Sequence, residues 1–372
     1  MKKMFLVLAT MLFVFTLTAC GDSEDTLRLG TIGPYTGDYS LYGTSTRDGA
    51  QLAVNEINAA GGVLGMDVEL FAYDSKGDSV EGVNAYNRLR DVDEVHAVIG
   101  GTFSGVTLAI KEIAIEDGMP LFSPTATNAD VTLDAYNVFR ACYKDDFQGE
   151  MAAKFAGEDL GLTKAAVIYN REDAYSEGLA TAFIAAWEAY GVVVAEEAYG
   201  ASDKDYNAIL DNVKATDAEI IFLPGYVAEV GAILTQASGK GIEVPFIGGD
   251  GWDSIEEDYA DVAEGNYFGN HYAKTDSAAV VQDFIAAYTA EYGEAPNALS
   301  ALAYDAVYAA VEAFEASGST DADDFIAALS ALEFDGVTGH ISFDGNGDPI
   351  KEISIIQVED GEHKFIKKLS ND

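Results

Sequence analysis

The sequence predicts an α/β protein built from two doubly wound lobes. Short apolar strands alternate with helical segments along most of the chain, which is typical of parallel sheets covered by helices on both faces. The alternation runs through residues 27–122 and starts again at residue 165, with no proline-rich or low-complexity linker between. A length of 372 residues also suits two domains. Because the chain must pass between the lobes through short strands, we expect a hinge there.

In the first half, apolar runs and helical spacing define one lobe. Four apolar residues recur at helical spacing across 43–60, and Gly61-Gly62 ends that helix. Ser104 stands where a helix over 104–116 needs an N-cap. The predicted strands are 27–32, 68–73, 96–100 and 120–122, and the predicted helices are 43–60, 80–90 and 104–116.

The second half repeats this pattern and then changes character. The repeat predicts strands at 165–169, 192–198, 219–223 and 245–248 and helices at 175–190, 206–215 and 228–239. Two strongly helical segments follow at 278–292 and 300–316. Strands are predicted at 341–343, 353–358 and 364–368, with turns at 344–348 and 360–361. The turn at 344–348 begins like a calcium loop, but Pro349 and Ile355 replace the Gly and Glu that such a loop requires.

Composition and missing motifs exclude several classes of function. The chain has 63 acidic and 21 basic side chains, a net charge of −42, so its surface repels phosphates and nucleic-acid binding is not expected. No glycine-rich phosphate loop follows a strand, and the four histidines lack metal-ligand spacing. No nucleophile–base motif is present. We therefore predict no catalytic residues, no metal and no cofactor.

The first twenty residues predict export and a lipid anchor. Lys2-Lys3 precedes an apolar run over 4–17, which is too short for an ordinary transmembrane helix and suits a signal peptide. The segment Leu17-Thr18-Ala19-Cys20 resembles the bacterial lipobox, so residues 1–19 are expected to be removed and Cys20 to be lipidated. Loss of both lysines leaves a net charge of −44. With Cys20 lipidated, no internal disulfide can form, and Cys142 is expected to be a small buried side chain.

Side chains that suit an α-amino acid follow the predicted strands. Ligands of open α/β sheets bind beyond the carboxyl ends of the strands. There, Ser104 and Thr127 offer hydroxyl donors, and the helix that starts near Ser104 offers N–H groups for a carboxylate. Asp250 can receive an ammonium group. Aromatic walls with polar tips come from Tyr42, Tyr175, Tyr226 and Trp252.

At these loops the sequence resembles the leucine/isoleucine/valine-binding family, the type I extracytoplasmic solute-binding proteins of ABC importers. The similar segments are 33–43, 55–65, 73–75 and 175–179. The resemblance covers nearly all of the chain after the signal segment. It implies the type I periplasmic binding protein fold, in which two Rossmann-like lobes joined by a three-strand hinge close on a ligand. The implied N-terminal lobe is 26–141 with 273–353, and the C-terminal lobe is 142–272 with 354–372, after a spacer over 20–25.

The resemblance also implies which residues bind the ligand. Ser104, Thr125 and Thr127, with Ala126 between them, match the positions that hold the carboxylate and amine of the ligand. The positions lining the rest of the cleft are Tyr42, Tyr175, Tyr226, Asp250 and Leu299. The implied function is to bind a branched-chain or other aliphatic amino acid and deliver it to membrane permease subunits. We expect a monomer held by its lipid on the outer face of the cell membrane, with a Gram-positive-type surface favoured.

Departures from the family pattern leave the ligand open. Asp250 stands where the branched-chain binders often carry Glu, Leu299 stands where they often carry Phe, and Gly77 and Phe103 replace the disulfide of the N-terminal lobe. An amide, an aromatic acid or a small peptide is an alternative ligand, and a sensor on the same fold is an alternative function. Individual site residues also have structural alternatives. Ser104 can cap a helix, Leu299 can be helix core, and Trp252 can cover the hinge or the rim.

Overall fold

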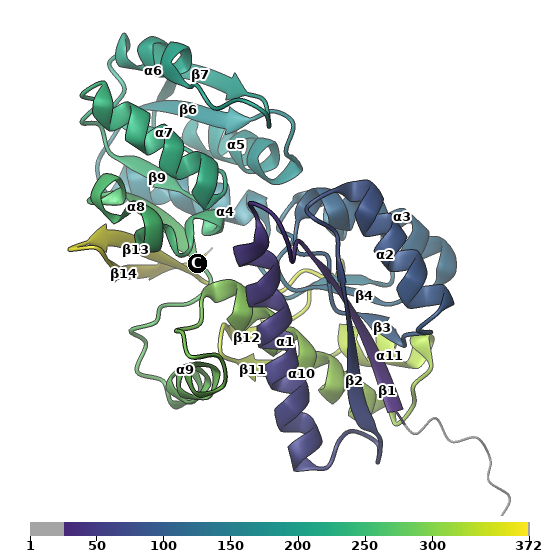
Figure 1. Ribbon diagram of the computed structural model, residues 1–372. Helices are drawn as coiled ribbons and strands as arrows, with labels where there is room; N and C mark the ends of the chain where they lie inside the picture. Colours follow the sequence, from purple (N-terminus) through teal and green to yellow (C-terminus); the bar gives the residue numbers. More distant parts are fainter. Residues whose placement is uncertain (1–25, 371–372) are drawn as a thin grey trace, which may run out of the picture.

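Two sheets organise the computed structural model, which describes residues 26–370 (Figure 1). The first sheet is wholly parallel, with strand order β2-β1-β3-β4-β5. Its strands are β1 (Thr26–Gly33), β2 (Asp67–Asp74), β3 (Ala97–Val98), β4 (Leu121–Ser123) and β5 (Val138–Arg140). The doubly wound prediction for this lobe is confirmed, although β3 is shorter than the predicted strand and β5 was not predicted.

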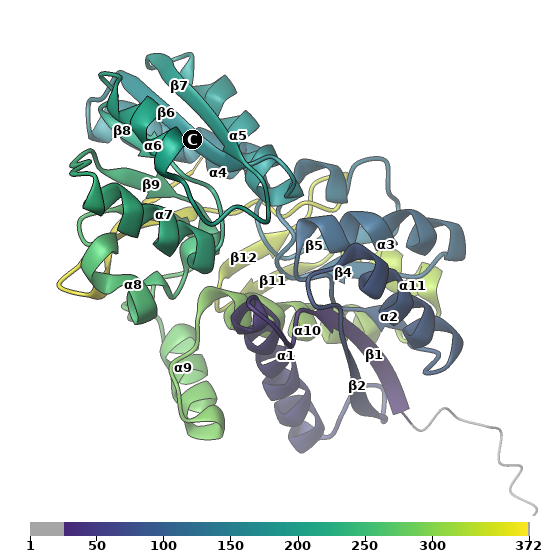
Figure 2. The same ribbon diagram turned by 45° about the horizontal axis from the view of Figure 1, so that its top comes forward.

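Helices cover both faces of this first sheet. Side chains of α2 (Ser79–Asp91) and α3 (Ser104–Asp117) pack on one face. The other face is covered by α1 (Ser40–Ala60) together with two helices from much later in the chain, α10 (Ala298–Ser317) and α11 (Ala322–Ser330). Both views place these late helices beside the N-terminal elements (Figures 1 and 2). Gly49 allows α1 to lie against α10, because a Cβ at this position would overlap the Ser300 carbonyl.

The second sheet is mixed, with strand order β14-β13-β10-β9-β8-β6-β7. Its parallel part repeats the first lobe, but β13 pairs antiparallel with both β10 and β14. The strands are β6 (Lys164–Asn170), β7 (Val192–Tyr199), β8 (Ile220–Phe222), β9 (Phe246–Gly248), β10 (Tyr267–Asn270), β13 (Ile353–Glu359) and β14 (Glu362–Leu369). The prediction of two successive α/β units is therefore confirmed, with an antiparallel edge added to the second.

Five helices belong to this second lobe. α4 (Asp145–Lys154) packs against α5 (Ala174–Trp187), and a π-helical turn over Phe155–Asp159 extends it. On the other side of the sheet in Figure 1, α7 (Val227–Gly239) packs against α6 (Asn207–Lys214) and α8 (Ile255–Ala263). Neither α4 nor α8 was predicted. α4 is cut short by the π-helical turn, and α8 contains a kink at Tyr259, so neither shows a long regular period.

The chain passes between the two sheets three times. It leaves the first sheet after Arg140, returns after Asn270 through α9 (Ala279–Tyr292), and enters the second sheet again at Ile353. A two-stranded ribbon, β11 (Glu333–Gly336) with β12 (Gly339–Ser342), precedes the third passage. The predicted turn at 344–348 is present, because the Asp344 N–H donates to the Asp348 carbonyl. It joins strands of different sheets.

Three further observations complete the fold. Cys142 is fully buried, as predicted, and burial raises the pKa of its thiol. Within residues 26–370, no helix combines the length and the apolar character needed to cross a membrane. The signal peptide, Cys20 and the spacer over 20–25 lie outside the described residues.

Candidate functional site

A small cavity of about 20 Å³ lies between the lobes, at the carboxyl ends of the parallel strands. Eight of the ten residues proposed from the sequence line it, and the structure adds Thr102, Phe103 and Gly251. The eight are Tyr42, Ser104, Thr125, Thr127, Tyr175, Tyr226, Asp250 and Leu299. Residues far apart in the sequence therefore share one cavity because α1, α10 and the strand-end loops of both sheets converge there.

The first lobe contributes hydroxyls and a helix N-terminus. Ser104 is the first residue of α3, while Phe103 holds the N-cap position and makes no side-chain capping bond. The prediction that Ser104 caps the helix is therefore wrong. Its hydroxyl instead accepts the Asn128 N–H at 3.2 Å, and the Thr125 hydroxyl donates to the Thr102 carbonyl at 2.7 Å. The N–H groups of the first turn of α3 leave this end of the cavity suited to an anion.

The second lobe contributes a carboxylate held on both sides. Asp250 Oδ1 accepts from Gln148 Nε2 at 3.1 Å, and its backbone N–H donates to Gln148 Oε1 at 2.7 Å. Asp250 Oδ2 lies 3.0 Å from Nε2 of His271. Burial lowers the pKa of His271, although Asp250 opposes this, so the ring is neutral at pH 7 and donates its Nε2–H to the carboxylate. Neither Gln148 nor His271 could be identified from the sequence, because neither follows a strand end that was predicted.

A second acidic group lies close to this end of the site. Asp145, at the start of α4, is 1% exposed, and its backbone N–H donates to the Thr127 carbonyl at 2.9 Å. Burial and then the negative charge of Asp250 raise the pKa of the Asp145 carboxyl well above its usual range. Asp145 does not line the cavity and was not proposed from the sequence.

Tyr42 joins the lobes directly. Its hydroxyl, on α1, donates to the Gly251 carbonyl at 2.7 Å and accepts the Val227 N–H at 2.7 Å. Val227 is the first residue of α7, and the N–H groups at the start of a helix have no partner within the helix. The hydroxyl of Tyr42, in the first lobe, therefore accepts one of these N–H groups from the second lobe. Tyr226 lies between the lobes too, with its ring centroid 5.1 Å from Tyr42 and 4.6 Å from Phe103. The structure is therefore closed around the cavity.

Two residues proposed from the sequence do not reach the cavity. Trp252 is fully buried in the second lobe, where its indole N–H donates to the Leu223 carbonyl at 2.9 Å. It is a core residue, so the expectation of an aromatic wall at this position is not met. Ala126 is also fully buried, and its carbonyl accepts from Arg140 at 3.1 Å, away from the cavity.

Arg140 anchors the loop that carries the first-lobe hydroxyls. This arginine is 0% exposed, and its guanidinium donates to the carbonyls of Ala126 and Asn128 and to the Thr132 hydroxyl. Its Nε lies 2.7 Å from Asp348 Oδ1. The turn that carries Asp348 therefore fixes the cavity loop through Arg140.

Comparison with known proteins agrees with this geometry. A family model described as periplasmic binding protein matches residues 26–362. The Leu/Ile/Val-binding protein of Rhizobium johnstonii is 32% identical, over 87% of this chain and 88% of that protein. A leucine binding protein from Thermotoga maritima superposes with a TM-score of 0.88 at 33% identity, covering 93% of this chain and 99% of the other.

A second solved structure carries a bound amino acid. The branched-chain amino acid transporter substrate binding protein of Streptococcus pneumoniae, in complex with isoleucine, has a TM-score of 0.87 and 33% identity. The match covers 92% of this chain and 99% of that chain. The first two relatives are named for binding leucine or leucine, isoleucine and valine, and the third is named as the substrate binding protein of a branched-chain amino acid transporter. With its two-lobed α/β fold and a cavity at the strand ends, the chain belongs to the leucine/isoleucine/valine-binding family of periplasmic binding proteins.

Proposed function

We propose that this protein is the extracytoplasmic substrate-binding component of an ABC transporter and binds an aliphatic α-amino acid. One observation carries the proposal. A single small cavity places hydroxyls and the N-terminus of α3 on one side and the carboxylate of Asp250 on the other. This arrangement complements the carboxylate and ammonium groups of a zwitterion. Relatives named for binding leucine, isoleucine and valine support this ligand class.

Each part of the ligand has its own partners. Ser104, Thr127 and the first N–H groups of α3 receive the carboxylate. Asp250, held by Gln148 and His271, receives the ammonium group. The side chain of the amino acid lies against Phe103, Tyr226 and Leu299, and this apolar end favours an aliphatic group. We also propose that the protein performs no chemistry on the ligand, which is supported by relatives named as binding proteins.

Binding is coupled to closure of the lobes. We assign 26–141 and 273–353 to one lobe and 142–272 and 354–372 to the other. Because the ligand touches both lobes only when they are closed, it favours closure by its differential contacts. A monomer then presents this closed form to the permease subunits. The family is extracytoplasmic, which agrees with a partner in the membrane.

Thermal unfolding in the presence of single amino acids tests the function. At 1 mM, a ligand with a dissociation constant of about 1 µM adds about 4 kcal/mol to the stability of the folded state. Leucine, isoleucine and valine are expected to give the largest increases in Tm. Valine has one methylene fewer than the other two, a difference of about 1–3 kcal/mol in binding free energy. An unchanged Tm with every α-amino acid would contradict the proposal. Stabilisation only by amides or aromatic acids would show that the protein binds those ligands instead of an aliphatic amino acid.

Tyr42→Phe is expected to weaken amino-acid binding while leaving the fold intact. Without the hydroxyl, closure buries the Gly251 carbonyl and the Val227 N–H unpaired, whereas water satisfies both in an open form. Each unsatisfied group costs about 1–3 kcal/mol, so the two together correspond to an affinity loss of about 30-fold or more. Calorimetry with leucine measures the loss. Tyr169→Phe, which removes an exposed hydroxyl bonded to Glu196, is the control and should bind normally.

We also propose that Cys20 carries a lipid that anchors the protein to the outer face of the cell membrane. The sequence around Cys20 supports this proposal. Cys20→Ala is expected to release a binding-competent protein into the medium, because a single non-lipidated chain lacks the apolar anchor. Fractionation of cells and medium measures this. Retention of the variant in the membrane fraction would contradict the lipid anchor.

A further inference from the structure

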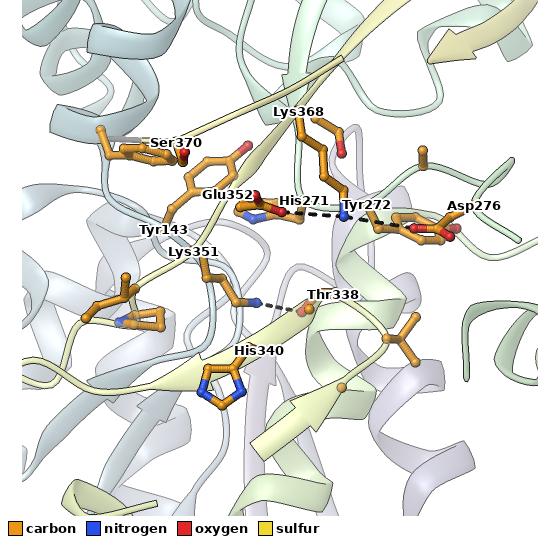
Figure 3. A pocket seen from close by; sticks show the side chains of 18 of the residues that line it. Tyr143, His271, Tyr272, Asp276, Thr338, His340, Lys351, Glu352, Lys368 and Ser370 are labelled. Atoms are coloured by element: carbon orange, nitrogen blue, oxygen red, sulfur yellow. Dashed lines mark hydrogen bonds and ion pairs between the residues drawn. The ribbon is translucent and has the colours of Figure 1, made fainter. Parts of the chain in front are cut away.

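A second, larger cavity lies at the hinge. It has a volume of about 600 Å³ and is lined by residues of all three passages between the lobes, among them Tyr143, His271 and Lys351 (Figure 3). Both lobes complete its wall, through Ser354 of β13 on one side and Val337-Thr338 between β11 and β12 on the other. Small-molecule sites commonly have volumes of about 300–1,000 Å³. The hinge cavity is therefore large enough for a small ligand.

Lys351 supplies this cavity with an ammonium group that interacts with the charge of Asp305 but forms no direct ion pair with it. Its ammonium donates to the Thr338 hydroxyl at 2.6 Å, and it forms no ion pair with any residue in 26–370 (Figure 3). The nearby Asp305 accepts three hydrogen bonds, from the Val337 N–H, the Thr338 N–H and the Thr338 hydroxyl, and its negative charge favours the charged form of Lys351. An ammonium has three donors, so two remain for a ligand. Burial lowers the pKa of Lys351 to about 8, which still leaves it mostly charged at pH 7.

Three of the four acidic residues that line the hinge cavity lie beside cations other than Lys351, and the fourth is bonded within its own turn. Lys368 Nζ lies 3.6 Å from Glu352 and 4.0 Å from Asp276 (Figure 3). Asp348 pairs with Arg140 at 2.7 Å and with Lys144 at 3.2 Å. Asp344 accepts the N–H groups of Asn346 and Asp348 within its own turn. Lys351 is therefore a cation of this cavity that keeps donors for an anionic ligand.

The mouth of the hinge cavity is apolar. Val280 is 46% exposed and Ile350 is 69% exposed, and both line the cavity. Tyr272 and Val337 extend this apolar surface inward. These exposed apolar groups lie beside the ammonium of Lys351, which has two donors left. The combination suits a ligand that has an anionic head and a short hydrocarbon tail.

We propose that the hinge cavity is a second ligand site, which takes a small aliphatic carboxylate and whose occupancy favours the closed form. The carboxylate binds Lys351 and the tail lies against Val280 and Ile350. Because the wall comes from both lobes in their closed arrangement, a ligand that bridges them stabilises that arrangement. His271 also connects the two sites. Its ring lines the hinge cavity, stacks on Tyr143 at 3.7 Å, and donates to Asp250 at the amino-acid site.

Titration of the purified protein with isobutyrate, followed by calorimetry, tests the site directly. Saturable binding is expected, with an affinity loss of at least about tenfold in Lys351→Gln, because a charge-assisted hydrogen bond is removed. Lys164→Gln makes the same charge change at an exposed residue of β6 and should bind isobutyrate normally. Ile350→Glu places a negative charge at the exposed mouth and should weaken binding several-fold without affecting folding. No binding by the wild type, or equal losses in both lysine variants, would overturn the proposal.

The double variant Ser104→Ala/Thr127→Val separates the hinge cavity from the amino-acid cavity. It removes the hydroxyls that would hold a carboxylate between the lobes, yet isobutyrate binding should persist. Loss of binding in this variant would place isobutyrate in the amino-acid cavity and overturn the proposal. This titration does not depend on amino-acid binding, so it can succeed even if the proposed function fails.

A second titration tests the coupling, which does rest on the proposed function. Saturating isobutyrate is expected to raise leucine affinity several-fold in the wild type and to leave it unchanged in Lys351→Gln, because coupling between two sites is reciprocal. An unchanged leucine affinity in the wild type would overturn the coupling. A weaker apparent affinity would show competition for one cavity and overturn the second site.

Discussion

Asp250→Ala is expected to weaken amino-acid binding by about 10²–10³-fold and to leave the fold intact. In the wild type the carboxylate lines the cavity between Gln148 and His271. Without it, lobe closure would bury the ligand ammonium with no negative partner. Removing one member of a buried charge pair costs about 3–5 kcal/mol, and each 1.4 kcal/mol is tenfold in affinity. Calorimetry with leucine, isoleucine and valine measures the change.

Two further variants make this result specific. Asp250→Asn keeps a similar shape but loses the charge, so it should bind nearly as weakly as Asp250→Ala. Asp258→Ala removes an exposed carboxylate from α8 in the same lobe and should leave affinity unchanged. A wild-type affinity in Asp250→Ala would refute the ammonium assignment. An equal loss in Asp258→Ala would instead point to the general negative field of this acidic protein.

Arg140→Met is expected to lower the free energy of unfolding by about 3–5 kcal/mol, which is the usual cost of breaking a buried ion pair. The substitution leaves Asp348 with Lys144 as its remaining cation. It also removes the Arg140 donor from the Ala126 carbonyl and from the Asn128 carbonyl, which keeps only the Val131 N–H. These carbonyls flank the hydroxyl of Thr127 in the amino-acid cavity. Urea unfolding measures the stability, and leucine titration below the unfolding transition should show weaker binding.

The control for this prediction is an exposed arginine. Arg171 has a half-exposed side chain and lies 3.9 Å from Glu172, so Arg171→Met should change stability by less than about 1 kcal/mol. Asp348→Asn should reproduce part of the Arg140→Met loss, because it removes the charge from the same pair. Equal small effects of Arg140→Met and Arg171→Met would show that the buried pair contributes no more than a surface pair.

Much of the fold could be predicted because its longer elements have strong local signals. α1 ends where Gly61-Gly62 predicted, and the strands β6, β7 and β13 lie close to their predicted bounds. The elements that were missed are short or irregular. β5 has three residues and β10 has four, and such lengths show no period that distinguishes a strand from a loop.

The candidate site was also predicted in part. Strand-end loops identified most of the cavity residues, because parallel strands bring their carboxyl ends to one edge of the sheet. The loops could not show which way each side chain points. Trp252 follows a strand end as Asp250 does, but the 3-10 turn over Asp250–Trp252 directs the indole into the core and leaves the carboxylate in the cavity.

The sequence by itself determined the α/β class, the two repeated units and the acidic surface, because these depend on local periodicity and composition. It also carried the signal segment and the loops that resemble the family. The tertiary structure decided how distant segments meet. Only the folded chain brings α10 back against α1, sets His271 behind Asp250, and lets Tyr42 close one lobe on the other. The physical reason is that these contacts join residues that are neighbours only after long-range packing, and local sequence patterns carry no record of such distances.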